Sequence, residues 1–310
     1  MRILVVGAGA TGGYFGARLV QAGRDATFLV RSERAARLAQ RGLRITGLGE
    51  RTVLRPRVID AQDIDSPYDV ILLAVKATGL EQAVDDMARA VGPGSLIVPV
   101  LNGVRHIDML AARFGDGVVL GGVAKVATTL DAQGDIVRLA DVQDLRYGAR
   151  GGTSPARLRE AHRVLSDAGF STRLSAHIDS EMWSKWIFIA SVGAVTCLMR
   201  GSVGEVVAVP GGAAFAKNVV EECASVAAAA GYPVPDPALR QTLASVTEEG
   251  SPLTSSLYRD VLEGRSAEVE HIFGDLVYRA NLLGVAVPLL DLATMQLRLH
   301  QNRVEGARVR

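Results

Sequence analysis

The sequence has very little cysteine. Of its 310 residues only Cys197 and Cys223 are cysteines, and both lie in apolar segments that are predicted to be helical. Neither has a second cysteine or a histidine at the spacing of a zinc site, which excludes a disulfide scaffold and a thiolate metal centre. We therefore expect two buried, reduced thiols in a cytoplasmic protein that binds no metal.

The sequence also lacks an excess of charge of one sign. Its 34 lysines and arginines nearly balance its 33 aspartates and glutamates, for a net charge of +1. Proteins that bind nucleic acids or acidic membranes electrostatically carry a basic excess, so the balance argues against both partners. With 48% apolar and 22% charged residues, the composition is that of a globular protein rather than a disordered one.

Long hydrophobic runs are missing as well. The longest uncharged apolar stretch that resembles a membrane span, residues 186–199, is shorter than the roughly 18 residues that a spanning helix needs. The apolar run at the N-terminus ends at Gly7, which is too early for the core of a secretion signal. The sequence thus predicts a cytoplasmic protein that does not bind a membrane.

What the sequence does contain is a change of pattern near residue 176. Before it, short apolar strands alternate with helices, with strands expected at 3–6, 26–30, 68–75 and 96–101 and helices at 10–22, 32–40, 80–91 and 155–168. After it, only helices are expected, at 179–199, 213–230, 237–247, 255–262, 267–283 and 289–301. Ser32 is expected to cap the helix that it begins, and the polar tail 303–310 to be frayed.

Continuously apolar strands separated by helices are typical of a parallel sheet that is covered on both faces. The predicted fold class is therefore α/β, with a Rossmann-type dinucleotide-binding domain at 1–176 and an all-helical domain at 177–310. No internal repeat or low-complexity tract interrupts either part.

A glycine-rich motif follows the first expected strand and opens the first helix. It comprises Gly7, Ala8, Gly9, Ala10, Thr11 and Gly12. The first glycine would permit the tight turn, the second would let a pyrophosphate approach the backbone, and the third would let helix and strand pack closely. This context predicts a dinucleotide site at the helix N-terminus; the alternative is a tight turn with no ligand.

The end of the second strand indicates which dinucleotide is bound. NAD sites usually place an acidic residue there, whereas this strand is followed by Arg31 and Ser32, with Arg34 nearby. A guanidinium grips a phosphate with two parallel hydrogen bonds, so these residues favour NADP over NAD. The alternative is that Arg31 is a solvated loop residue.

Several further segments, in this order, resemble the ketopantoate reductase family (2-dehydropantoate 2-reductase). They are the glycine segment 7–19, Arg31, the segment 75–77, the segment 101–103, Trp183 with Lys185, and Ser255, Ser256 and Glu268. The resemblance implies a Rossmann-type domain and a helical domain with the active site in the cleft between them. It further implies NADPH-dependent reduction of a small-molecule 2-oxo acid, by default ketopantoate to pantoate in pantothenate biosynthesis.

The resemblance also implies roles for individual residues. Lys185 matches the general acid that protonates the carbonyl oxygen, and Glu268 matches the acid that binds the substrate hydroxyl and orients the lysine. Ser256 matches the serine that holds the substrate carboxylate. Lys76 and Asn102 match residues that face nicotinamide and substrate, and with Glu268 they join the expected cofactor contacts. Taken singly, four of these residues would be assigned otherwise: Lys185 and Glu268 to solvated helix faces, Ser256 to a helix cap and Asn102 to a turn.

The sequence departs from the family at two positions of the expected substrate wall. Known members carry asparagines four and eight residues after the catalytic lysine, where this chain has Ile189 and Gly193. Positions 185, 189 and 193 share one helix face, so the wall is expected to be more apolar and, at Gly193, roomier. We infer a more apolar or bulkier 2-oxo acid, or another carbonyl compound, as the alternative substrate, unless Ser191, Thr196 or Lys125 replaces the lost polar groups.

Two other functions stay open at this point. One is a β-hydroxyacid or imine dehydrogenase of similar architecture, which would leave Ser256 and Glu268 unexplained. The other is a non-catalytic NADP-binding redox sensor, which would have no need for Lys185 as a proton donor. The sequence does not give the oligomeric state, and a homodimer is one possibility.

Overall fold

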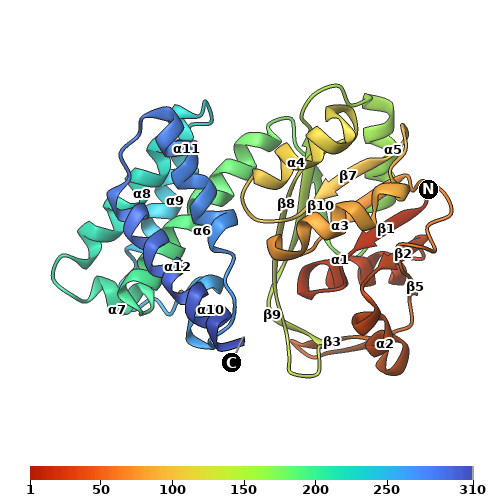
Figure 1. Cartoon of the computed structure of the whole chain (residues 1–310), viewed down its shortest axis with the longest axis horizontal. Helices are drawn as coiled ribbons and strands as arrows, with labels where there is room; N and C mark the ends of the chain where they lie inside the picture. Colours follow the sequence, from red (N-terminus) through yellow and green to blue (C-terminus); the bar gives the residue numbers. More distant parts are fainter. Residues whose placement is uncertain (309–310) are drawn as a thin grey trace. The chain divides into compact units, whose positions relative to one another are not determined.

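The computed structural model describes residues 1–308, which form two compact units (Figure 1). The first unit contains Met1–Leu101 and His106–Ile178, and the second contains Asn102–Arg105 and the chain from Asp179 onward. The division at residue 178 lies two residues after the predicted boundary. The four residues 102–105 were expected in the first domain, but they make their contacts within the second unit.

The first unit is built on a five-stranded parallel sheet with the strand order β5-β2-β1-β6-β7. Its strands are β1 (Ile3–Val6), β2 (Ala26–Leu29), β5 (Arg57–Ile59), β6 (Val70–Leu73) and β7 (Leu96–Pro99). All residues of β1, β2, β6 and β7 are buried, as expected of strands that are covered on both faces. The carboxyl ends of β1 and β2 therefore meet at one edge, where this type of sheet binds ligands.

The connecting helices of the first unit are mostly short. They are α1 (Ala10–Gln21), α2 (Ser32–Arg41), α3 (Leu80–Asp86), α4 (Arg105–Phe114) and α5 (Pro155–Leu165), with 3-10 turns η1 (Ala77–Gly79), η2 (Ala88–Ala90) and η3 (Asp116–Val118). The predicted helix over 80–91 is thus α3 followed by η2 rather than one helix.

A second sheet in the first unit has the strand order β10-β9-β3-β4, with β8 paired to β9. Its strands are β3 (Leu43–Gly47), β4 (Glu50–Leu54), β8 (Leu120–Leu130), β9 (Ile136–Ala149) and β10 (Ser171–Leu174). The long β8–β9 hairpin, yellow-green in Figure 1, packs on α1 and places the turn at Gly134 near the start of α2. This hairpin supports the glycine-rich loop from one side.

The second unit is helical. Its elements are α6 (Ile178–Met199), α7 (Val203–Val207), α8 (Gly212–Ala229), α9 (Asp236–Val246), α10 (Ser256–Leu262), the π-helix η4 (Glu270–Gly274), α11 (Asp275–Leu283) and α12 (Pro288–Arg308). Helices α7, α9, α11 and α12 contact α8, whose inward face is buried. The predicted fold class, an α/β domain with a parallel sheet followed by a helical domain, is confirmed.

Helix α6 matches the helix predicted at 179–199 to within one residue and extends beyond the uncharged apolar stretch 186–199. It has 22 residues and, by length and composition alone, is long and apolar enough to cross a membrane. Within its most apolar stretch 67% of the residues are buried inside the protein, as is typical of a helix in a protein core.

Two local expectations are wrong. The N-cap of α2 is Arg31 rather than Ser32. Ser32 is the first residue of the helix, and no side chain caps this end with a hydrogen bond. The segment 303–308 is not frayed, because α12 continues to Arg308; residues 309 and 310 lie outside the described part of the chain.

Candidate active site

The glycine-rich loop connects β1 to α1, and each of its three glycines has a different surrounding. Gly7 has a φ of +96°, a left-handed conformation that side chains disfavour, and its N–H bonds the carbonyl of Leu29. A Cβ on Gly12 would lie 2.3 Å from the carbonyl oxygen of Gly7 and 2.7 Å from the Cβ of Ala74. A Cβ on Gly9 would meet no protein atom within 4 Å. Gly7 and Gly12 are thus required by the protein, whereas the space beside Gly9 is open.

The N-terminus of α1 fits a bound anion. Gly9 is its N-cap and provides no side-chain hydrogen bond, and the first turn contains no acidic residue. The first backbone N–H groups of a helix have no partner within the helix, and the helix dipole favours negative charge there. The loop therefore has the geometry and the charge to hold the pyrophosphate of a dinucleotide, with Ala8, Ala10 and Thr11 supplying further backbone groups.

Arg34 supports this loop rather than facing a ligand. Its Nε donates to the carbonyl of Ala8 at 3.0 Å, and its Nη1 donates to the carbonyl of Gly134 at 2.9 Å. The side chain is half-buried, and this burial together with the neighbouring Arg37 lowers the pKa of its guanidinium. Arg34 thus joins the glycine loop to the β8–β9 turn and is a positioning residue.

Arg31 is the arginine that remains at the surface. It is exposed, and its Nη2 lies 2.7 Å from the point where a Cβ of Gly79 would stand. Lys76 is the N-cap of η1, the turn to which Gly79 belongs. Arg31, the exposed Ser32 and the segment that begins at Lys76 therefore lie together beyond β2 and β6.

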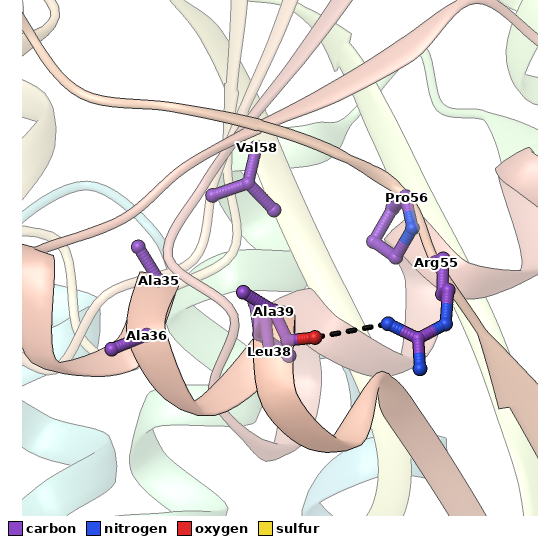
Figure 2. A pocket seen from close by; sticks show the side chains of 7 residues that line it. All are labelled: Ala35, Ala36, Leu38, Ala39, Arg55, Pro56 and Val58. Carbon is purple, nitrogen blue, oxygen red and sulfur yellow. Dashed lines mark hydrogen bonds between the residues drawn. The ribbon is translucent and has the colours of Figure 1, made fainter.

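A hollow of about 410 Å³ lies between α2 and the segment 55–58, and none of the predicted site residues lines it. Figure 2 shows that α2 and the segment leading into β5 line it and that the Arg55 guanidinium bonds the carbonyl of Ala39, at 2.9 Å. Its lining residues are Ala35, Ala36, Leu38, Ala39, Arg55, Pro56 and Val58. The glycine loop and this hollow have no residue in common.

In the second unit, three elements that carry predicted site residues pack together. The Trp186 indole N–H on α6 donates to the carbonyl of Ile272 in η4 at 3.0 Å. Trp186 directly follows Lys185 in the chain, and Ile272 comes four residues after Glu268. Gly193 of α6 lies under Phe273 of η4 and close to Leu257 of α10. The helix of Lys185, the segment of Glu268 and the helix of Ser256 are therefore fixed to one another.

The side chains of these three residues reach the surface of the unit. Lys185 and Glu268 are partly exposed, and Ser256 is exposed. The N-cap of α10 is Ser255, whose hydroxyl accepts from the N–H of Tyr258 at 3.0 Å. The capping role is thus taken by Ser255, and the hydroxyl of Ser256 lies in the first turn.

Asn102 joins the same cluster through His271. The His271 ring hydrogen-bonds the main chain of Asn102, and the His271 carbonyl oxygen lies 2.9 Å from where a Cβ of Gly103 would be. Gly103 has a φ of +74°, so this position requires glycine for both reasons. Burial lowers the pKa of His271 although Glu268 and Asp275 oppose the shift, so burial favours the neutral ring.

The expectation of extra room at Gly193 is wrong. A Cβ on Gly193 would lie 3.0 Å from Cζ of Phe273, which is fully buried, so an aromatic ring fills the space. Ile189, one turn earlier, is partly exposed and lies one helical turn after Lys185 on α6. The wall beside Lys185 is therefore apolar, as expected, but it is not enlarged.

Two of the residues considered as polar substitutes, Ser191 and Thr196, do not restore the lost groups beside Lys185. Ser191 and Thr196 are fully buried, and the Thr196 hydroxyl bonds the carbonyl of Val192 and the hydroxyl of Ser255. Lys125 is on β8 in the first unit. Within residues 1–308, no group of three or more histidine, cysteine or acidic side chains is arranged to hold a metal ion.

Four supporting residues were not found from the sequence: Trp186, His271, Phe273 and Thr128. The Thr128 hydroxyl donates to the carbonyl of Ala10 at 3.2 Å, on the loop side of α1. All four act through contacts between segments far apart in the chain. The only sequence signal was that His271 lies one helical turn after Glu268.

Both units match sequence families with related descriptions. Residues 3–152 match the family described as Ketopantoate reductase PanE/ApbA, and residues 177–301 match Ketopantoate reductase PanE/ApbA C terminal. Together these segments span most of the chain.

Individual proteins are similar over the whole chain. An uncharacterized oxidoreductase of Bacillus subtilis (strain 168), YkpB, is 33% identical over 302 residues, covering 97% of this chain and 99% of that protein. The 2-dehydropantoate 2-reductase of Halobacterium salinarum is 27% identical, with coverages of 97% and 99%.

Among solved structures, D-mandelate dehydrogenase with NADH and anilino(oxo)acetate has a TM-score of 0.87, covering 98% of this chain and 100% of that one. Its identity is 20%, so this likeness concerns the fold.

Proposed function

Because the chain belongs to the ketopantoate reductase family, whose members are oxidoreductases acting on CH–OH groups, we propose that it reduces a 2-oxo acid with NADPH. The observation that carries the proposal is the packing of α6, η4 and α10, which fixes Lys185, Glu268 and Ser256 within one unit. Ketopantoate is the default substrate, and the product would then enter pantothenate biosynthesis.

The first unit would hold the cofactor. The N-terminus of α1 has no side-chain cap, and no protein atom fills the space beside Gly9. Both features suit the pyrophosphate. Arg31 and Ser32 would bind the 2′-phosphate that distinguishes NADPH from NADH, because a guanidinium attracts this dianion and a hydroxyl can donate a hydrogen bond to it. When bound, the nicotinamide supplies the hydride.

The second unit would supply the proton and the substrate contacts. Lys185 would donate a hydrogen bond to the keto oxygen and transfer its proton as the carbon is reduced, so that the oxygen becomes a hydroxyl. Glu268 would accept a hydrogen bond from the substrate hydroxyl, and the Ser256 hydroxyl would bind the carboxylate. Asn102 would also contact the substrate, and the His271 ring would hold its main chain in place.

A second candidate substrate is a more apolar 2-oxo acid. Ile189 is the residue next to Lys185 on the exposed part of α6, and Phe273 closes the space over Gly193. An isoleucine offers no partner to a substrate hydroxyl, and an unpaired polar group costs affinity by orders of magnitude. The same fold in D-mandelate dehydrogenase accommodates anilino(oxo)acetate, an aromatic 2-oxo acid analogue.

Turnover of ketopantoate and of a series of aliphatic and aromatic 2-oxo acids, with NADPH and with NADH, tests the proposal. We expect NADPH to be oxidised at least about tenfold more efficiently than NADH, and Ile189→Asn to shift preference towards ketopantoate. Gly193→Ser is the matched control, because its side chain would meet Phe273 rather than substrate. Absence of turnover with every 2-oxo acid would overturn the reductase assignment, and an unchanged preference in Ile189→Asn would overturn the role of that residue.

A further inference from the structure

The open face of helix α6 changes in character along its length. Between Met182 and Cys197 the helix is partly exposed only at Ser184, Lys185, Phe188 and Ile189. The first two of these residues are polar, and the last two, hereafter the apolar pair, are a phenylalanine and an isoleucine. All residues from 190 to 197 are buried. The apolar pair is therefore the last part of the open face, one helical turn beyond the candidate proton donor.

Phe188 lies on the opposite flank of Lys185 from η4 and α10. An α-helix turns by about 100° per residue, so Trp186 and Gly193 lie about 100° and 80° from Lys185 in one direction. Both of these residues contact η4, and Gly193 also lies close to α10. Phe188 lies about 60° from Lys185 in the other direction, with Ile189 between the two flanks. The surface at Ile189 is thus bordered by η4 and α10 on one side and by the Phe188 ring on the other.

The residues proposed to hold a 2-oxo acid lie before and after the apolar pair. Lys185, the proposed partner of the keto oxygen, comes one turn before the pair on α6. Ser256, the proposed partner of the carboxylate, directly precedes Leu257, whose Cδ1 would lie 3.7 Å from a Cβ of Gly193. Gly193 is one turn after the pair. A substrate that reaches both partners therefore lies across the apolar pair and brings its own side chain against it.

The chemistry of the apolar pair selects among such side chains. Neither member has a hydrogen-bond donor or acceptor, so a substrate hydroxyl placed there loses its bonds to water without replacement. Ketopantoate carries a hydroxyl in its side chain. An aromatic ring has no such group, buries a large apolar area, and gains further from packing against the ring of a phenylalanine. The pair therefore suits an aromatic side chain better than that of ketopantoate.

We propose that Phe188 and Ile189 bind the side chain of the substrate and that this side chain is an aromatic ring, as in phenylglyoxylate. The assignment rests on the proposed reductase function and names its substrate class. The keto carbon accepts the hydride of NADPH and the keto oxygen accepts the proton of Lys185, which gives the 2-hydroxy acid and NADP⁺. The aromatic ring is unchanged, so the apolar pair acts on specificity and takes no part in proton transfer.

Steady-state oxidation of NADPH by the whole chain tests the substrate class with ketopantoate, trimethylpyruvate, pyruvate and phenylglyoxylate. We expect kcat/KM for phenylglyoxylate to exceed that for ketopantoate by about tenfold or more. Trimethylpyruvate, which is ketopantoate without its hydroxyl, should fall between the two. A kcat/KM for any of the three aliphatic acids that equals or exceeds that for phenylglyoxylate would overturn the inference and leave the reductase function standing. NADPH oxidation with none of the four, nor with any other 2-oxo acid, would overturn both.

Variants of Phe188 test its part in this selection. Phe188→Ala should lower the ratio of kcat/KM for phenylglyoxylate to that for pyruvate by about tenfold, mainly through a higher KM, because the pyruvate methyl group has little to bury. Phe215→Ala is the matched control, since Phe215 is also partly exposed on a helix of the second unit, and the ratio should stay unchanged.

Phe188→Leu keeps an apolar side chain at the same place and covers the case in which the alanine variant does not fold. It should lower the same ratio, since the contact between two aromatic rings is lost. Thermal melting and NADPH titration show that each variant is folded. An unchanged ratio in both folded variants of Phe188, or an equal fall in Phe215→Ala, would overturn the role of this residue.

Discussion

Gly9 and Gly12 belong to one motif, but the structure gives them different reasons to be glycine. A Cβ on Gly12 collides with the backbone of Gly7, whereas a Cβ on Gly9 points into open space. The first restriction comes from the protein itself, and the second can only come from a ligand that approaches the backbone.

This difference gives a prediction at the residue scale. Gly12→Ala should lower the free energy of unfolding by about 1–3 kcal/mol, because the added methyl overpacks the contact between helix and strand. Gly9→Ala should leave the melting temperature unchanged and weaken NADPH binding by about tenfold or more. Thermal melting and a fluorescence titration with NADPH separate the two effects. A Gly9→Ala variant that binds NADPH normally would contradict the assignment of this loop.

Candidate site residues could be proposed from the sequence only where a motif carried them. The glycine loop, Arg31 and Lys185 could be named from the sequence because their spacing along the chain is itself the signal. His271 could not, because its bond to Asn102 joins residues that are 169 positions apart. The error at Gly193 has the same origin, since nothing in the sequence shows that Phe273 fills the space.

At the scale of elements, buried and exposed strands differ in how well the sequence predicts them. Strands β1, β6 and β7 are wholly apolar because both faces are covered, and each was expected. Strands β3 and β4 are partly exposed and contain Arg44 and Arg51, so no continuous apolar run marks them. The π-helix η4 was expected as ordinary helix, because one wide turn changes no residue pattern.

Strand β4 depends on an ionic contact instead of an apolar one. Glu50 accepts two hydrogen bonds from Arg18 of α1, at 2.8 and 2.6 Å, and lies 3.1 Å from Arg138 of β9. Burial alone would raise the pKa of Glu50, but the hydrogen bonds from Arg18 and Thr52 outweigh it and lower the pKa below its usual value. The contact therefore stabilises the fold while Glu50 is ionised.

We expect Glu50→Gln to lower the free energy of unfolding at pH 7 by about 1–3 kcal/mol. Because the folded pKa is lowered, this contribution is complete above the ordinary carboxyl pKa and is lost as the pH falls through the folded value. The difference between wild type and variant should thus shrink on acidification in urea unfolding experiments. Glu33→Gln, at an 88% exposed side chain paired with Arg37, should change little at any pH.

The bond between Trp186 and Ile272 connects the helix of Lys185 to the segment of Glu268. Trp186→Phe removes the donor and leaves a buried carbonyl unpaired, so we expect a loss of about 1–3 kcal/mol in stability. It should also reduce kcat while NADPH binds unchanged, because the proton donor and its acidic neighbour are less well fixed. Trp183→Phe is the comparison variant, since that ring contacts Tyr232 and Trp186 but its replacement leaves the hydrogen bond from Trp186 to Ile272 in place. Equal kcat values in the two variants would show that this bond has no part in the site.

At the scale of the whole molecule, the two units divide the proposed chemistry between them. The first unit contains the glycine loop and Arg31, and the second contains Lys185, Glu268 and Ser256, each set with its own supporting contacts. The segment 102–105 leaves the first unit after β7 and makes its contacts in the second, so the chain passes between the units there as well as near residue 178. Loss of the Lys185 side chain should accordingly leave cofactor binding intact.

The most direct test of the account is rapid mixing of the NADPH-loaded protein with its best 2-oxo acid, comparing wild type with Lys185→Met. We predict that wild type consumes NADPH and that the variant binds NADPH with the same affinity but consumes it at least about 100-fold more slowly, because the proton donor is gone. If Lys185→Met oxidises NADPH as fast as wild type, Lys185 is not the proton donor and the central claim is wrong.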